Sequence, residues 1–256
     1  MSRALDRRRW TRFRRGVTLP VLLIALWFFA THAGLVDSRL LPPIEAVLRA
    51  GRVEWTEGAL LQNLEASLFR NLAGFAIGST LGLAFGMALG ISPLIEKLCG
   101  PLFHGLRQVA LLAWVPLICM WLGLGEASKI AFIAIAAFVP VALNTYQGAR
   151  AAPPQLLEVS RVLLLSPRQM FRRVYLPAAL PSVVTGIHLA LIYSWLATIG
   201  AEYFMALGPG LGGLILAGRD RFEMDLVILG VFILGLVGFA LNLIAQFAAG
   251  RLLRWE

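Results

Sequence analysis

Long apolar stretches separated by shorter polar segments dominate the chain. An α-helix needs about 20 mostly apolar residues to cross a bilayer, and six stretches approach that length. We expect spans near Gly16–Ala33, Arg70–Ile91, Arg107–Leu122, Lys129–Gln147, Ala178–Ala201 and Leu226–Ala249. The pattern therefore predicts an all-α integral membrane protein with six transmembrane helices, of which the third is the shortest.

The first apolar stretch follows a basic tail, residues 1–15, an order that is also typical of secretory signal sequences. A signal sequence usually ends in a small-residue cleavage site after a short apolar core. Here the run closes on Trp27-Phe28-Phe29-Ala30-Thr31-His32 without such a site. We therefore interpret this stretch as an uncleaved first span.

The remaining segments complete a single membrane domain over residues 1–256. Residues 34–69 form an extracytoplasmic segment that Leu41-Pro42-Pro43 interrupts. Short helices are expected at Ile44–Arg49 and at Glu57–Phe69, and the second of them either ends before the second span or runs into it. Residues 70–249 form a five-span core, and residues 250–256 form a second cytoplasmic tail. No internal repeat or linker separates domains.

Composition agrees with a membrane protein. The 256 residues are 59% hydrophobic and 14% charged, with a mean hydropathy of +0.77, whereas soluble domains contain roughly 25% charged residues. The net charge of +9 could suggest a nucleic-acid partner. However, with the N-terminus in the cytoplasm, 16 of the 23 Lys and Arg residues fall in the tails and in residues 92–108 and 149–177. This is the positive-inside distribution, and it predicts cytoplasmic termini.

Catalytic and metal-binding patterns are absent from the sequence. Cys99 and Cys119 form no close-spaced pair, which argues against a disulfide framework or a zinc site. No HExxH, GxSxG or paired-carboxylate pattern occurs. The glycine-rich stretch Gly208–Gly213 lacks the Lys-Ser/Thr of a phosphate-binding loop, so we expect it to let the backbone re-enter the membrane surface beside a cavity. We expect neither an enzyme nor a metal protein.

A ladder of glycines marks one face of the second span. The five glycines recur every fourth residue, at Gly74, Gly78, Gly82, Gly86 and Gly90. Glycine at this spacing lets another helix backbone approach closely. The ladder predicts a helix interface, either as static packing or as a contact that slides in a moving core.

Few polar side chains lie within the apolar stretches, and such residues are candidates for a translocation path. The candidates that we select are Asn144, His188, Tyr193 and Glu202, while Asn71 and Asn242 invite the same two interpretations as Asn144. A neutral hydrogen bond to a neighbouring helix is the alternative role for His188 and Asn144. For Glu202, the mouth of a pore and the headgroup region are both open.

The most informative polar segment is residues 149–177, which we call the elbow. Leu156, Val159, Leu163 and Leu164 recur at helical spacing and predict a short amphipathic helix. Ser166-Pro167, with Gln169 three residues after the serine, then reads as a capping box with proline in the first helical turn. We expect this second helix to end before Leu176-Pro177.

The elbow resembles the EAA loop of ABC-importer permeases, the membrane subunits of binding-protein-dependent transport systems. Glu158-Val159-Ser160 stands for Glu-Ala-Ala, and Val174-Tyr175-Leu176-Pro177 stands for the closing Ile-x-Leu-Pro. The family's glycine position is Leu164 here, so the chain departs from the pattern at that point.

The third span and its exit resemble permeases for nitrate, aliphatic sulfonates and taurine. The likeness lies in Trp114-Val115-Pro116-Leu117 and in Trp121-Leu122-Gly123-Leu124-Gly125-Glu126. We expect Pro116 to kink this span and the glycines to form a tight turn at its outer end.

The resemblance implies a type I permease fold in the bacterial inner membrane, with the elbow docked on a cytoplasmic ATPase. The coupling residues would be Glu158, Val159, Ser160, Arg161, Ser166, Pro167, Arg168, Leu176 and Pro177. It also implies a second permease copy forming a homodimer, two ATP-binding subunits and an extracytoplasmic substrate-binding protein. ATP and magnesium would bind the ATPase, and this chain would hold no cofactor. An ion-coupled secondary transporter and a membrane-embedded enzyme are the alternative classes.

Overall fold

A computed structural model describes residues 18–56, 58 and 60–252, and every regular element in this part of the chain is helical. An apolar helix at Thr18–His32 comes first. The elements that follow are α2 (Ile44–Thr56), α3 (Leu60–Ile91), α4 (Pro93–Leu106), a 3-10 turn (Leu111–Trp114), α5 (Val115–Leu122), α6 (Glu126–Arg150), α7 (Pro154–Val162), α8 (Pro167–Met170), a π-helical turn (Phe171–Tyr175), α9 (Leu176–Phe204), α10 (Leu211–Asp220) and α11 (Met224–Leu252). The all-α prediction is confirmed.

Four helices of the described chain are long and apolar enough to cross a membrane, and a bent pair raises the number to five. They are α3, α6, the continuous run Pro167–Phe204 and the run Met224–Arg251. The helix Thr18–His32 is shorter than these. The six-span topology and the cytoplasmic termini therefore stay predictions, and the basic tail 1–15 lies outside the described residues.

The expected third span, Arg107–Leu122, is not one helix. Residues 107–110 are non-helical, and α4 meets the helical segment Leu111–Leu122 at an angle of 99°. Pro116 lies in the first turn of α5, where no intrahelical hydrogen bond is lost, so it starts a helix and does not kink one. Gly123, with φ of +75°, makes the expected turn after α5.

The residues group into two compact units. Of the described residues, one unit comprises 18–56, 58 and 214–232, and the other comprises 60–213 and 233–252. In the first unit, α2 begins at Ile44 as predicted but continues to Thr56, and the indole N–H of Trp27 donates to the Pro42 carbonyl at 3.0 Å. The second unit contains every site described below.

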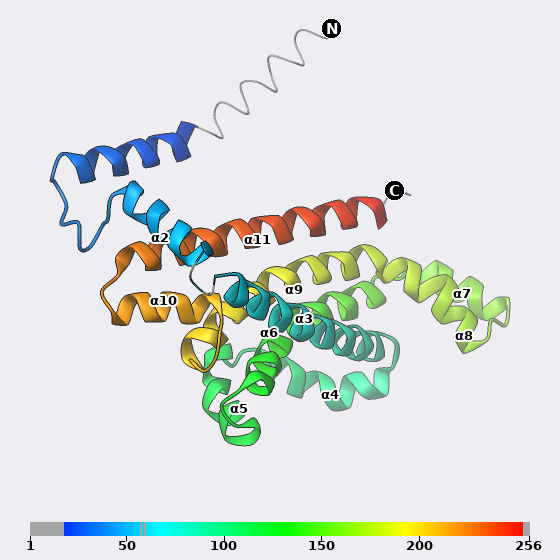
Figure 1. Cartoon of the computed structure of the whole chain (residues 1–256). Helices are drawn as coiled ribbons and strands as arrows, with labels where there is room; N and C mark the ends of the chain where they lie inside the picture. Colours follow the sequence, from blue (N-terminus) through cyan, green and yellow to red (C-terminus); the bar gives the residue numbers. More distant parts are fainter. Residues whose placement is uncertain (1–17, 57, 59, 253–256) are drawn as a thin grey trace, which may run out of the picture. The chain divides into compact units, whose positions relative to one another are not determined.

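Helices α3, α6 and α9 form the centre of the second unit and run alongside one another (Figure 1). The α3–α6 contact passes through the glycine ladder. A Cβ added at Gly78 would lie 2.2 Å from the Ala134 carbonyl oxygen, and one at Gly86 would lie 2.3 Å from that of Ala142. The added Cβ at each of the other ladder positions would also lie within 3.0 Å of an α6 atom. The ladder thus removes side chains where two helix backbones touch.

The second elbow helix does not end before Leu176-Pro177. It continues through the π-helical turn into α9, so that residues 167–204 form one helical run. The Leu176 N–H donates to the Phe171 carbonyl, five residues earlier. The wider π turn leaves room for the ring of Pro177, which has no N–H of its own. The proline therefore changes the helix locally without stopping it.

Candidate functional site

The elbow is built from α7 and α8, which lie together at one end of α6 and α9 (Figure 1). The serine cap predicted from sequence is present. Ser166 Oγ accepts a hydrogen bond from the Gln169 N–H at 3.3 Å, and Gln169 Oε1 accepts one from the Ser166 N–H at 2.9 Å. Two of the N–H groups at the start of the helix are satisfied in this way, so the cap fixes where the chain turns into α8.

Leu164 lies in the left-handed region of backbone space, with φ of +51°. The Leu165 N–H donates to the Ser160 carbonyl at 3.0 Å. This six-to-one hydrogen bond is that of a Schellman cap in which Leu164 occupies the position that most often holds glycine. The chain therefore makes the same kind of turn at the family's glycine position, although Leu164 must adopt a φ angle that is unfavourable for leucine.

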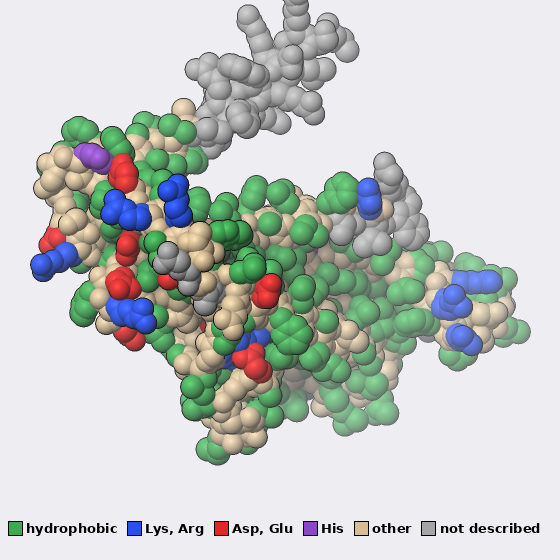
Figure 2. Space-filling model, viewed as in Figure 1, with side chains coloured by type: hydrophobic (Ala, Val, Ile, Leu, Met, Phe, Trp, Pro, Cys, Tyr) green, Lys and Arg blue, Asp and Glu red, His purple; other side chains and the backbone are tan. Residues whose placement is uncertain are grey.

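The outer surface of the elbow is exposed and mixes apolar with charged side chains. Glu158, Arg168, Arg172 and Arg173 are exposed, and Figure 2 shows basic side chains gathered over this end of the molecule. Val159 is 53% exposed, Leu163 65% and Leu164 89%. Ser160, in contrast, is buried and donates to the Leu157 carbonyl, while the Arg161 side chain lies outside the described part.

A cluster of buried charges joins α3, α6 and α9 at the end opposite the elbow. Arg70 on α3 is 1% exposed and donates to Glu202 Oε1 at 2.7 Å and to Glu126 Oε1 at 2.6 Å. Glu202 is 2% exposed and also accepts from the Ser67 hydroxyl at 2.7 Å. A buried ion pair is favourable only when its remaining hydrogen-bonding groups are satisfied, and these contacts meet that requirement.

The glycine-rich stretch Gly208–Gly213 is held by this cluster. The Gly212 N–H donates to Glu202 Oε2 at 2.9 Å, and the Gly210 N–H donates to Asn63 Oδ1 at 2.8 Å. Lys129, which is buried, donates to the Leu207 carbonyl. A Cβ at Gly210 would lie 2.6 Å from the Glu202 carboxyl carbon. The glycines thus let the backbone approach a buried carboxylate.

Two candidates for the translocation path have structural partners. His188 Nε2 lies 2.9 Å from Asn242 Oδ1 on α11, which is the neutral inter-helix hydrogen bond considered as the alternative. Glu202 is 2% exposed and is enclosed by the ion cluster. Neither residue shares a cavity with the other two candidates.

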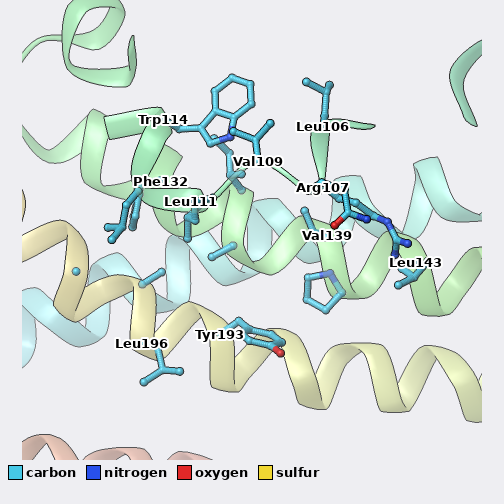
Figure 3. Close-up of a pocket in the computed structure, with 18 of the residues that line it drawn as sticks. Leu106, Arg107, Val109, Leu111, Trp114, Phe132, Val139, Leu143, Tyr193 and Leu196 are labelled. Carbon is cyan, nitrogen blue, oxygen red and sulfur yellow. The ribbon is translucent and has the colours of Figure 1, made fainter. Parts of the chain in front are cut away.

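Asn144 and Tyr193 do share a cavity. It has a volume of about 650 Å³ and lies between α6, α9 and the break after α4 (Figure 3). Its walls are largely apolar, with Phe132, Val139 and Leu196 among them. The Asn144 amide donates to the Pro140 carbonyl of its own helix at 2.8 Å. An apolar cavity with a few polar groups is the usual form of a small-ligand site.

Three cations at these sites were not predicted as site residues. Arg70 and Lys129 begin two predicted spans, and Arg107 begins the third. Each lies at the edge of an apolar stretch, and this position can be recognised from the sequence. What sequence cannot give is the burial of Arg70 and Lys129 or the position of Arg107 in the cavity wall. The described residues contain no group of His, Cys, Asp and Glu that could hold a metal ion.

The chain resembles known membrane proteins over most of its length. Residues 70–255 match the model of a family described as binding-protein-dependent transport system inner membrane component. The chain is 35% identical over 242 residues to the aliphatic sulfonates transport permease protein SsuC of Bacillus subtilis, covering 94% of this chain and 87% of that protein. It is 32% identical over 244 residues to the taurine transport system permease protein TauC of Escherichia coli, covering 93% and 88%.

A solved structure shares the fold. The chain superposes on a chain of the MetNI methionine ABC transporter in an inward-facing conformation with a TM-score of 0.64. The match covers 77% of this chain and 99% of the other at 17% sequence identity. Because identity is low, this likeness concerns the arrangement of helices alone.

Proposed function

The chain belongs to the family of binding-protein-dependent transport system inner membrane components, and we propose that it carries a small anion such as an aliphatic sulfonate, taurine or nitrate. It is a non-catalytic permease subunit of an ABC importer in the inner membrane. ATP-binding subunits and a substrate-binding protein are the partners that this family implies. Family membership rules out the ion-coupled secondary transporter and the membrane-embedded enzyme.

The anionic substrate is supported by two relatives and by the cavity. The relatives carry the names of aliphatic sulfonate and taurine permeases, and both kinds of compound contain a sulfonate group. The cavity of about 650 Å³ between α6 and α9 is large enough for such a small molecule.

The elbow is the proposed contact with the ATPase. The observation that carries this proposal is the exposed apolar surface at the end of α7, where Val159, Leu163 and Leu164 are each more than half exposed. Apolar side chains of this size, rimmed by charges, are typical of a protein-binding surface. Glu158 and Arg168 flank this surface and would supply polar contacts at its rim.

Coupling follows from differential affinity. If the closed ATPase pair binds the elbow of the outward-open state more tightly than that of the inward-open state, ATP binding shifts the permease outward. The continuous helical run from Pro167 to Phe204 gives this shift a mechanical route, because the elbow and the cavity wall lie on one helix. ATP and magnesium would bind the partner, and this chain would need no cofactor.

We also propose two copies of the chain per transporter. The segment Leu111–Leu122 is too short to cross a bilayer alone. Its outer part exposes Met120 and Trp121, which are 77% and 69% exposed. A second copy of the chain would cover this surface beside the cavity.

Co-purification and uptake test the proposal. The tagged chain is expected to recover an ATP-binding subunit from membranes of its own organism. The reconstituted complex, supplied with its binding protein, is expected to accumulate labelled ethanesulfonate or taurine in vesicles only when ATP is present on the ATPase side. Accumulation that follows an ion gradient without ATP would overturn the assignment.

A further inference from the structure

Arg107 is the one charged residue among those that line the cavity in the described part of the chain. It occupies the first position of the non-helical break, residues 107–110, between α4 and the segment Leu111–Leu122. Its backbone N–H still bonds to the Phe103 carbonyl at 3.1 Å. The break therefore presents this side chain from the end of α4.

The cavity lies beside the middle of α6, not near either end. Its α6 wall runs from Phe132 to Asn144 within a helix that spans Glu126–Arg150. Figure 3 shows Arg107 and Tyr193 reaching this space from different elements. The α6 part of the cavity wall belongs to a helix that is long and apolar enough to cross the bilayer, and a charged side chain beside such a wall is a candidate for a function.

The guanidinium of Arg107 has no charge partner in the described chain. Its Nε atom is buried and makes no hydrogen bond, and no acidic residue lines the cavity. Arg70, by comparison, is satisfied by two carboxylates. Arg107 as a whole is partly buried, and its unpaired guanidinium in the wall of a ligand-sized cavity leaves room for an anion that arrives from outside the chain.

We propose that Arg107 is the anion-binding group of the translocation cavity and that it recognises an oxyanion headgroup of the sulfonate type. The proposal rests on the function proposed above and adds the residue that would select the charge. A guanidinium offers several N–H donors in a planar fork that fits the oxygens of such a group. The Tyr193 hydroxyl and the Gln108 amide, which also line the cavity, can donate to the remaining oxygens.

A substrate must also leave the site. One cation in a largely apolar wall gives a single charge-assisted contact, which is strong enough to select an anion and weak enough to release it when the cavity opens to the other side. This arrangement differs from the Arg70 cluster, where several fixed partners hold the charge permanently.

Uptake by reconstituted transporters tests the proposal. The probe is labelled ethanesulfonate at a concentration below saturation, and uptake is divided by the amount of assembled complex in each preparation. Losing a hydrogen-bonded charge contact corresponds to about a ten-fold loss or more, so Arg107→Met is expected to reduce uptake by about that factor. Arg107→Lys is expected to retain most of the uptake, because it keeps the positive charge. Equal uptake by wild type and Arg107→Met would overturn the role of Arg107.

A chemical rescue separates charge from packing. In a background with Cys99→Ser and Cys119→Ser, which removes both native thiols, Arg107→Cys is modified after assembly by a cationic or an anionic methanethiosulfonate reagent. The cationic adduct is expected to restore uptake and the anionic adduct to abolish it, with no effect of either reagent on the background protein. Equal effects of the two reagents at position 107 would overturn the proposal. If wild type takes up neither ethanesulfonate nor taurine, the proposed substrate class fails first, and the role of Arg107 fails with it.

Discussion

At the scale of single residues, Leu164 holds a backbone conformation that is strained for leucine and that glycine adopts without strain. A left-handed conformation costs an L-residue roughly 1–2 kcal/mol, and the Leu164 side chain is 89% exposed. Leu164→Gly is therefore expected to raise the stability of the purified protein by about 1 kcal/mol, provided that the ATPase does not need the leucine side chain. Thermal unfolding in detergent measures the change.

Leu163 is the matched control for this substitution. It is 65% exposed and does not have a positive φ, so Leu163→Gly gains no relief of strain and adds backbone entropy to the unfolded chain. A decrease of about 0.5–1 kcal/mol is expected. A melting temperature that falls equally in both variants would contradict the assignment of strain to Leu164.

The ion cluster gives a second prediction at this scale. Glu202 is 2% exposed, whereas the Glu126 side chain is 53% exposed, and both contact Arg70. Removing one partner of a buried pair typically costs about 3–5 kcal/mol, whereas an exposed partner contributes about 1 kcal/mol or less. Glu202→Gln is therefore expected to destabilise the protein far more than Glu126→Gln.

Thermal unfolding of the two purified variants at equal detergent and salt measures this difference. Glu202→Gln is expected to lower the melting temperature clearly, and Glu126→Gln only slightly. A larger decrease for Glu126→Gln than for Glu202→Gln would mean that the exposed Arg70–Glu126 pair contributes more stability than the buried Arg70–Glu202 pair.

At the scale of elements, the glycine ladder sets the distance between α3 and α6. An added Cβ at Gly78 would lie 2.2 Å from a backbone oxygen that cannot move alone, and one at Gly82 would lie 2.8 Å from the Phe138 carbonyl oxygen. Gly82→Leu is expected to block assembly or transport, and Gly82→Ala to be milder. Gly78→Ala is expected to be more damaging than Gly82→Ala.

Gly105 on α4 is the control for a glycine substitution in a helix. A Cβ there meets nothing within 4 Å, so Gly105→Ala is expected to leave the stability unchanged or to raise it by up to about 1 kcal/mol through helix propensity. Expression, melting temperature and uptake are measured for all four variants. Unchanged values for Gly82→Leu would show that this face of α3 does not pack on α6.

The elements also show where sequence reasoning succeeds and where it stops. Spacing predicts the cap at Ser166 and the start of α2 because these depend on neighbouring residues. It misses the 99° bend at the break after α4. It also misses the helix that continues through Pro177, because a π turn makes room for a proline that local rules treat as the end of a helix. Similarly, lone cations at span edges are visible in the sequence, but their burial is not.

At the scale of the whole molecule, the charges along the chain predict its topology. The distribution of Lys and Arg predicts that both termini and the elbow are cytoplasmic. Reporter fusions after Arg168 and at the C-terminus are expected to report a cytoplasmic location. An extracytoplasmic signal at either point would contradict the six-span topology, and such a signal after Arg168 would also place the elbow out of reach of an ATPase.

Substitution of Glu158 tests the proposed contact between the elbow and the ATPase. It lies exposed on α7 beside the apolar side chain of Val159. If it only formed an exposed pair with Arg161, three residues later, it would contribute about 0.5 kcal/mol or less, and Glu158→Ala would have almost no effect. If it contacts the ATPase, losing an interface contact of more than about 1 kcal/mol should weaken assembly or uncouple hydrolysis from transport.

The expected result is a chain that inserts and folds normally but transports several-fold less. Insertion is followed by the yield and melting temperature of the chain, assembly by recovery of the ATPase in a pull-down, and coupling by the ratio of uptake to ATP hydrolysis in vesicles. Glu223→Ala is the control, because Glu223 is also an exposed glutamate but is far from the elbow in sequence. Wild-type assembly and coupling in Glu158→Ala would remove this residue from the ATPase contact, and the exposed apolar side chains of the elbow would then have to carry the contact without it.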